Sequence, residues 1–324
     1  MEKLSNLYRR YHGFMLGLVF GAILYLRDEK RYTVHLRRMR EFIAEAGINI
    51  PIPETWAEFM DVKETLVTDL GGALQNVDDR IYLHWFLGLE ACGLASKLDA
   101  KPDIINFISN QFEEIARICG VSRTAYLRYQ KRLNNADKKM TWSGILNPAY
   151  TLLESLIAAA DPEEDTCFVA MPFSSDFPER YKHFYRPALE KHGFRALRGW
   201  DGFGTEEYLA LLQTIIKKCG AFLGEISEDP DVGCSNSNVI HEVGISHGLA
   251  KLTFLVAEES SKPPSNLSQL TACNYKRDDQ NWPISAIKNF DFYKAMLDAS
   301  YQFKRDEEKE IESEAKKSPY QPKE

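Results

Sequence analysis

The sequence predicts an α/β domain in its C-terminal half and an all-α domain before it. After residue 161, short apolar runs alternate with amphipathic segments, the pattern of a parallel sheet with helical crossovers. Before residue 160, apolar residues recur at three- and four-residue spacing, which indicates helices. The acidic stretch 161–165 separates the two patterns. We therefore expect a helical domain over residues 1–160, an α/β domain over 161–303 and a charged tail over 304–324.

In the first half, the spacing predicts helices over 38–46 and 103–118, with breaks at 51–53, 71–72 and 101–102. The apolar stretch 13–26 is shorter than the roughly 20 residues that a membrane-spanning helix needs. Its glycines repeat every fourth residue, at Gly13, Gly17 and Gly21. Such a stripe permits close helix packing, so we expect a helix inside a water-soluble core and no membrane partner.

In the second half, four apolar runs predict strands, over 167–171, 194–197, 221–226 and 252–256. Three amphipathic segments, over 181–192, 206–219 and 239–250, predict the helices between them. Gly193 and Gly220 follow the first two helices as expected C-terminal caps. Ligands bind such sheets at the carboxyl ends of the strands.

Charge and cysteine content narrow the possible classes of protein. Residues 1–160 hold 20 Lys and Arg against 19 Asp and Glu, and residues 161–324 hold 20 against 28. Neither half is basic enough to indicate nucleic-acid binding from bulk charge. The six cysteines form no CxxC pair and no zinc-spaced cluster. We expect reduced thiols in a cytoplasmic protein, with no metal and no cofactor.

Four segments with chemical potential follow the expected strands. They are Met171-Pro172-Phe173-Ser174, Trp200-Asp201-Gly202, Glu225-Ile226-Ser227 and the run 236–248, NSNVIHEVGISHG. In this order they resemble the nucleoside 2-deoxyribosyltransferase superfamily, over about residues 166–281. That superfamily includes nucleotide N-glycosidases and is similar in topology to TIR domains, some of which cleave NAD.

The resemblance implies a flavodoxin-like fold and cleavage of an N-glycosidic bond in a nucleotide or in NAD. The family's catalytic glutamate corresponds to Glu242, its second acid to Glu225, and its sugar-contacting asparagine to Asn238. The expected substrate-binding residues are Met171, Pro172, Phe173, Ser174, Asn238 and Gly244. The insert 229–235 is longer than the family pattern leads us to expect.

The chemistry of the bond agrees with a carboxylate in this position. Breaking a ribosyl–base bond builds positive charge at the anomeric carbon, which a carboxylate can stabilise or attack. Glu242 lies early in its expected helix, where the helix dipole favours the ionised form. Asp201 or Glu225 can orient the substrate or protonate the leaving base. We expect both within one substrate length of Glu242, with a raised pKa on one of the two.

Each of these residues also has a structural reading. Glu242 can be an ordinary dipole-favoured glutamate, Glu225 a helix cap and Asp201 a turn residue. Gly244 and Gly248 are expected to let the helix approach the sheet. His241 and His247 are expected to be structural or exposed rather than catalytic.

Residues 112–129 resemble a helix-turn-helix, with a Gly-Val-Ser turn before a helix rich in Arg and Tyr. A serine-capped turn is common between any two helices, so DNA binding stays an alternative here.

The sequence is therefore compatible with three functions. The first is an N-glycosidase, by hydrolysis or by transfer; the second is a nucleotide-sensing module without catalysis; and the third is a helix-turn-helix regulator. Residues 1–160 are expected to regulate, through a homo-oligomer or a protein partner, rather than to perform the chemistry. This layout resembles that of bacterial antiphage effectors, by analogy only.

Overall fold

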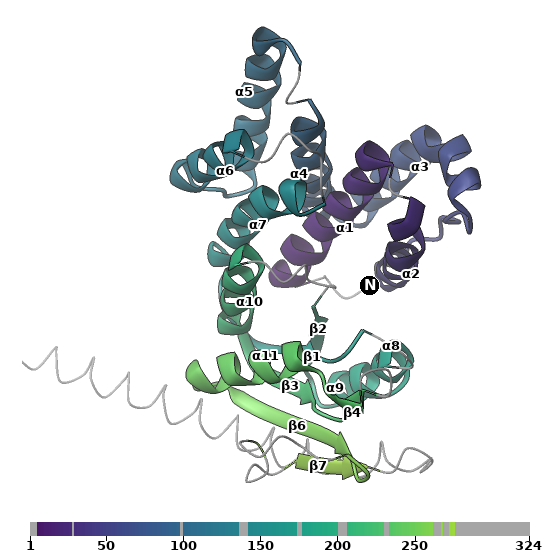
Figure 1. Cartoon of the computed structure of the whole chain (residues 1–324), viewed down its shortest axis with the longest axis vertical. Helices are drawn as coiled ribbons and strands as arrows, with labels where there is room; N and C mark the ends of the chain where they lie inside the picture. Colours follow the sequence, from purple (N-terminus) through teal and green to yellow (C-terminus); the bar gives the residue numbers. More distant parts are fainter. Residues whose placement is uncertain are drawn as a thin grey trace, which may run out of the picture. The chain divides into compact units, whose positions relative to one another are not determined.

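The structure is a computed structural model, and it divides the chain into two compact units. It describes residues 5–27, 29–97, 100–135, 142–173, 177–199, 206–229, 233–261, 267 and 272–275. The helical unit comprises Met1–Glu164 and Gly199–Lys218, and the α/β unit comprises Asp165–Arg198 and Cys219–Glu324. Figure 1 labels most elements of both units.

The described part of the helical unit contains eight α-helices. They are α1 (Asn6–Leu26), α2 (Glu29–Glu45), α3 (Trp56–Val77), α4 (Asp79–Ser96), α5 (Pro102–Ile118), α6 (Arg123–Asn135), α7 (Trp142–Ala158) and α10 (Glu206–Lys218). The helices expected over 38–46 and 103–118 are confirmed by α2 and α5, and Pro102 begins α5. The break expected at Gly71-Gly72 is wrong, because both glycines lie inside α3.

The glycine stripe of α1 packs against α4. A Cβ added at Gly17 would lie 1.9 Å from the carbonyl oxygen of Trp85, and one at Gly21 would lie 2.9 Å from the Cβ of Cys92. From the other side, a Cβ at Gly88 would lie 2.1 Å from the carbonyl oxygen of Phe14. The two backbones thus approach more closely than any larger residue permits. No helix in the described part of the chain is long and apolar enough to cross a membrane.

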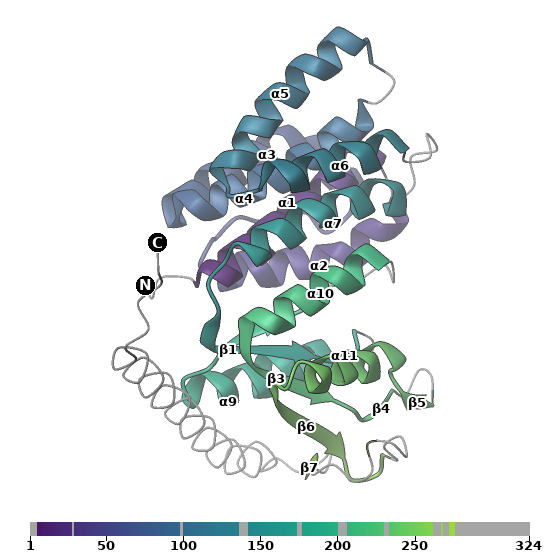
Figure 2. The same cartoon turned by 90° about the vertical axis from the view of Figure 1, so that its left-hand side faces the viewer.

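Helix α10 belongs to the helical unit, although it follows β2 and precedes β3 in the chain. It lies beside α7 in both views (Figures 1 and 2). The rings of Tyr150 and Tyr208 are 5.6 Å apart, and Lys218 donates a hydrogen bond to the carbonyl oxygen of Ala160. An ion pair joins Glu207 of α10 to Arg132 of α6.

The α/β unit carries the sheet. Its elements are β1 (Glu163–Ala170), α8 (Phe177–Arg180), the π-helical turn η1 (Tyr181–Tyr185), α9 (Arg186–Lys191), β2 (Arg195–Arg198), β3 (Cys219–Glu225), β4 (Glu228–Asp229), β5 (Cys234–Ser235), α11 (Ser237–Gly248), β6 (Leu252–Glu258) and β7 (Ala272–Tyr275). The four expected strands are confirmed as β1, β2, β3 and β6. The first of them begins earlier than expected, inside the acidic stretch.

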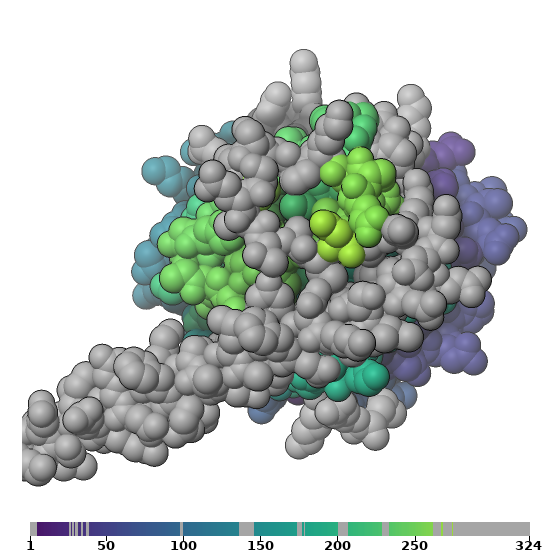
Figure 3. Space-filling model, turned by 90° about the horizontal axis from the view of Figure 1, so that it is seen from below, coloured from purple at the N-terminus to yellow at the C-terminus, as the bar shows by residue number. Residues whose placement is uncertain are grey.

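Of the described strands, all but β4 and β5 form one parallel sheet, in the order β2-β1-β3-β6-β7. Numbered along the chain without the β4–β5 hairpin, this is the 2-1-3-4-5 order of flavodoxin-like folds. The order reverses between β1 and β3, and ligands of such sheets bind outside the carboxyl ends of the strands at this point. The edge strand β7 was not expected from the sequence. Asn274 of this strand is exposed. In Figure 3 the yellow-green part of the chain, which contains β7, is visible on the surface.

Alternate residues of the strands pack on opposite faces of the sheet. One face places Cys167, Val169, Leu223, Phe254 and Val256 in a core with Tyr181, Tyr185 and Leu189 of η1 and α9. The other face meets α11, whose Val243 and Ser246 are buried. There a Cβ added at Gly224 would lie 2.9 Å from Val243 Cγ2.

The glycine that allows α11 to approach the sheet is therefore on β3 and not on the helix. A Cβ at Gly244 or Gly248 would meet no atom of the described residues within 4 Å. The packing role expected for these two glycines is wrong. The cap expected at Gly220 is also wrong, because α10 ends at Lys218 and β3 begins at the next residue. Gly193 does follow α9 in the left-handed conformation, with φ of 78°.

Candidate functional site

The parallel strands bring polar side chains to one edge of the sheet. Arg198 ends β2, Glu225 ends β3 and Glu258 ends β6, while Met171 follows β1 directly. The registers pair Val169 with Arg198 and Glu225 with Val256. Arg198 therefore lies level with the end of β1, and Glu258 lies two residues further along β6 than the partner of Glu225.

Glu225 is held by donors on both of its oxygens. The hydroxyl of Tyr185 donates to Oε2, and the backbone N–H of Ser227 donates to Oε1 at 2.9 Å. Residues 221, 223 and 225 share one face of β3, which is the face that η1 covers, and this explains why Tyr185 reaches Glu225. The carboxyl group has no exposed surface.

A second buried pair continues this arrangement on β6. Arg180 donates to Glu258 at 2.7 Å, with side-chain exposures of 7% and 11%. The hydroxyl of Ser227 accepts a hydrogen bond from the backbone N–H of Glu258 at 2.7 Å. Ser227 thus ties the end of β3 to the end of β6. We call Glu225, Tyr185, Ser227, Glu258 and Arg180 the buried polar network.

Burial raises the pKa of Glu225, while the hydrogen bonds from Ser227 and Tyr185 and the charge of Arg180 act in the opposite direction. The expectation that Glu225 carries a raised pKa is thus met, but its carboxyl group faces protein donors and not solvent. In this arrangement both oxygens of Glu225 are engaged by Tyr185 and Ser227 at the end of β3.

The first turn of α11 is built by an asparagine cap. The side chain of Asn236 accepts hydrogen bonds from the backbone N–H groups of Asn238, at 3.0 Å, and Val239, at 3.4 Å. Asn236 therefore has a capping role. The side chain of Asn238 is exposed. Glu242 follows four residues later, so the two side chains lie on the same side of the helix, one turn apart.

Glu242 is the one glutamate of this site that the described residues leave without a partner. Its carboxylate accepts no hydrogen bond and forms no ion pair among them, and its side chain is partly exposed. Burial raises its pKa to about 8. The expectation that Glu242 stays ionised is therefore wrong: it lies in the second turn of α11, where the dipole effect has faded, and desolvation dominates.

The segment after β1 is mostly core. Met171 and Pro172 are buried, and Met171 packs in the same core as η1. Phe173 is half-buried, with the guanidinium of Arg198 5.6 Å from its ring centroid. Arg198 also lies over the ring of Tyr181, at 5.1 Å. Among the described residues of this segment, Phe173 is the one with exposed surface to offer a ligand.

The structure also locates other residues that the sequence analysis named. His241 and His247 are exposed, as expected. The insert 229–235 contributes to the hairpin β4–β5, in which Glu228 pairs with Ser235. Ser174 and Asp201 lie outside the described residues.

Arg180, Tyr185 and Arg198 were not singled out from the sequence, and Ser227 was named only as the last residue of the segment after β3. Arg180 and Tyr185 reach Glu258 and Glu225 only when α8 and η1 pack on the sheet, so no local pattern marks them. Among the described residues, no group of three or more His, Cys, Asp or Glu side chains could hold a metal ion.

Models of known protein families give no match to the chain, and a search of curated proteins gives none either.

Proposed function

We propose that the α/β unit cleaves the N-glycosidic bond of a nucleotide or of NAD, with Glu242 as the reacting carboxyl group. One observation carries the proposal. Glu225 and Glu258 have donors that compensate their burial, whereas Glu242 has none among the described residues and its pKa is raised to about 8. An uncompensated carboxyl group costs stability, and such costs concentrate at functional sites.

The location supports this proposal. The strand order reverses between β1 and β3, and flavodoxin-like sheets bind nucleotides outside the strand ends at such a point. Glu242 lies about 7.5 Å along α11 from the start of the helix, by the rise of 1.5 Å per residue. Asn238 is one turn nearer that start and is exposed, so its amide can bind a sugar hydroxyl.

The proposed reaction transfers the sugar from the base to water or to an acceptor base. The bond between the anomeric carbon and the base nitrogen breaks, and its electron pair leaves with the base. Neutral Glu242 gives its proton to a leaving base that needs one. The resulting carboxylate then stabilises the charge on the sugar. Water or an acceptor base adds to the anomeric carbon and gives its proton to this carboxylate, which restores the neutral acid. The buried polar network keeps the ends of β3 and β6 in place.

The test is to incubate the full chain with deoxynucleotides, ribonucleotides and NAD and to separate the released bases by chromatography. We expect base release from one class of substrate. The variant Glu242→Gln keeps the size of the side chain but removes the acid, and should slow release by about 10³-fold or more.

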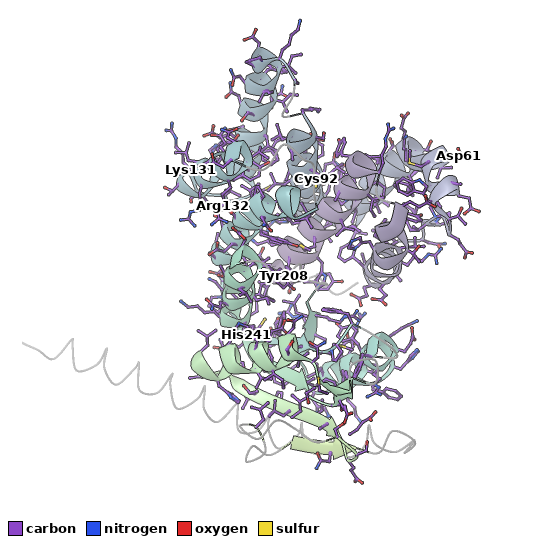
Figure 4. The ribbon with its side chains drawn as sticks, in the orientation of Figure 1. Asp61, Cys92, Lys131, Arg132, Tyr208 and His241 are labelled. Carbon is purple, nitrogen blue, oxygen red and sulfur yellow. The ribbon has the colours of Figure 1, made fainter. Side chains whose placement is uncertain are left out.

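The matched control is His241→Gln, an exposed neighbour on the same helix that Figure 4 labels. It should keep activity within a few-fold of the native chain. Nucleotide binding without release of any base would favour a sensor over an enzyme. Activity of Glu242→Gln close to that of the native chain would show that Glu242 is misassigned.

A further inference from the structure

The helical unit contains a second feature that the proposed function does not use, the turn between α5 and α6. It spans residues 119–122, and Gly120 adopts the left-handed conformation with φ of 92°. The backbone N–H of Val121 donates to the carbonyl oxygen of Ala116 at 2.9 Å, which closes the end of α5. The hydroxyl of Ser122 accepts a hydrogen bond from the N–H of Ala125 and begins α6. A short turn containing glycine is the connection found in helix-turn-helix motifs.

The inner side of this motif is fully packed. The buried residues are Phe112, Ala116, Cys119, Val121, Ala125, Tyr126, Tyr129 and Leu133. The rings of Phe112, Tyr126 and Tyr129 lie 5.7–6.2 Å from one another. Tyr129 donates to the carbonyl oxygen of Ala91 in α4 at 3.3 Å. The position of α6 is thus set by its neighbours, as a docking helix requires.

The outer side of α6 is basic and exposed. Its exposed residues include Arg123, Thr124, Leu127, Arg128 and Lys131, and Ser122 before them is exposed as well. The spacing places them along one side of the helix for more than two turns. We call these six residues the outer face of α6.

Two observations separate the outer face from an ordinary solvated surface. Helix α6 holds four cations and no acidic residue, in a chain with a net charge of −7. The fourth cation, Arg132, pairs with Glu207 and leaves the other three together, and Figure 4 labels Lys131 and Arg132 on this helix. Leu127 is 52% exposed between these cations. Helices gain stability from pairs of opposite charge at three- and four-residue spacing, and the sequence of α6 offers no such pair.

We infer that the outer face of α6 binds double-stranded DNA in the major groove. A helix with side chains is about 10–12 Å across, and the groove is about 12 Å wide. Arginine binds guanine or phosphate, lysine binds phosphate, and an apolar side chain such as Leu127 can contact a thymine methyl group. The N-terminus of a recognition helix contacts base edges, and the exposed residues Ser122, Arg123 and Thr124 occupy it here.

The test measures binding of the full chain to a fluorescent random-sequence duplex by anisotropy between 50 and 200 mM NaCl. We expect binding that weakens steeply with salt, since each neutralised phosphate contributes about −0.9 to the slope of log K against log salt. The variant Arg123→Ala/Arg128→Ala/Lys131→Ala should lose at least about tenfold in affinity at 50 mM NaCl and have a slope shallower by about 2–3. All three side chains are exposed, so the fold should be kept, as circular dichroism can check.

A matched control removes three other exposed cations, as Arg80→Ala/Lys182→Ala/Lys191→Ala. It should bind nearly as the native chain does. An equal loss in the control would show that binding follows bulk charge and not α6. Failure of the native chain to bind the duplex at 50 mM NaCl, or preferential binding to single-stranded DNA or to RNA, would overturn the inference.

Discussion

The hydroxyl of Tyr185 donates a hydrogen bond to the carboxylate of Glu225, and neither residue is more than 1% exposed. Tyr185→Phe removes this donor and should destabilise the fold by about 1–3 kcal/mol, the cost of an unsatisfied buried acceptor. The pKa of Glu225 should rise further, since the hydrogen bond lowers it. Denaturant unfolding and a carboxyl NMR titration measure the two effects. In the control Tyr181→Phe, the lost bond to Ala196 is 3.5 Å long, so a loss as large as that of Tyr185→Phe would contradict this account.

The pH dependence of stability should identify Glu242. Its pKa is about 8 in the fold against 4.5 for the ordinary group, so the stability it contributes is fully present below about pH 4.5 and is lost as pH rises through 8. Glu242→Gln cannot ionise, and above pH 8 it should be more stable than the native chain by on the order of a few kcal/mol. Thermal unfolding from pH 5 to 9 measures the difference. The control Glu64→Gln, an exposed site on α3, should change nothing, and a gain independent of pH would argue against a raised pKa.

The pH dependence of activity should distinguish the two substrate classes. Purine and pyrimidine bases need a proton to leave well, so with a nucleotide the rate should fall as pH rises through about 8 and Glu242 ionises. The nicotinamide of NAD leaves as a neutral molecule without a proton, and its cleavage needs the carboxylate. With NAD the rate should therefore rise through the same pH. Rates measured from pH 6 to 9.5 decide between the two, and a flat profile would exclude Glu242 as the titrating group.

Replacing two glycines of the helical unit by alanine should have opposite effects on stability, because Gly17 lies in the contact between α1 and α4 and Gly72 does not. Gly17→Ala would place a Cβ 1.9 Å from the carbonyl oxygen of Trp85, and backbone must move to accept it. We expect a loss of about 3 kcal/mol, at the upper end for overpacking. Gly72→Ala meets no described atom within 4 Å inside α3, and should gain about 0.5–1 kcal/mol from helix propensity. Denaturant titrations of both variants make the comparison, and equal effects would contradict it.

A truncated chain that begins at the acidic stretch should not fold correctly. A chain that begins at residue 161 keeps α10 but removes α7, on which Tyr208 packs beside Tyr150. We expect such a chain to aggregate or to lose helix content, so regulation by residues 1–160 cannot be tested by this cut. Size exclusion and circular dichroism against the full chain measure the effect. A folded, monomeric truncation would show that α10 does not depend on its helical partners.

The order of strands and helices could be predicted because buried parallel strands are short apolar runs, as in β1, β3 and β6. The edge strand β7 was not predicted, because its sequence, Ala-Cys-Asn-Tyr, is not an apolar run. At the junction of α10 and β3, a glycine pattern predicted a cap, yet Gly220 is buried inside the strand. Pairing of β3 with its neighbours in the sheet places Gly220 in a strand, and the sequence around Gly220 does not show that pairing.

The candidate site was predictable as a set of positions and not as an electrostatic environment. Glu242 and Asn238 follow from one motif on one helix. The pKa of Glu242 depends on what surrounds it in space, and the sequence indicated only the helix start. Tyr185 and Glu225 are 40 residues apart, and their hydrogen bond exists only because η1 covers one face of β3.

The membership of α10 in the helical unit also sets an order of events during synthesis. The ribosome completes β1 and β2 before it makes Glu206–Lys218. The helical unit, whose remaining helices have by then emerged, lacks its last member throughout that interval. Its folding therefore finishes only after part of the sheet has left the ribosomal tunnel, and an arrest of translation before residue 218 would leave both units incomplete.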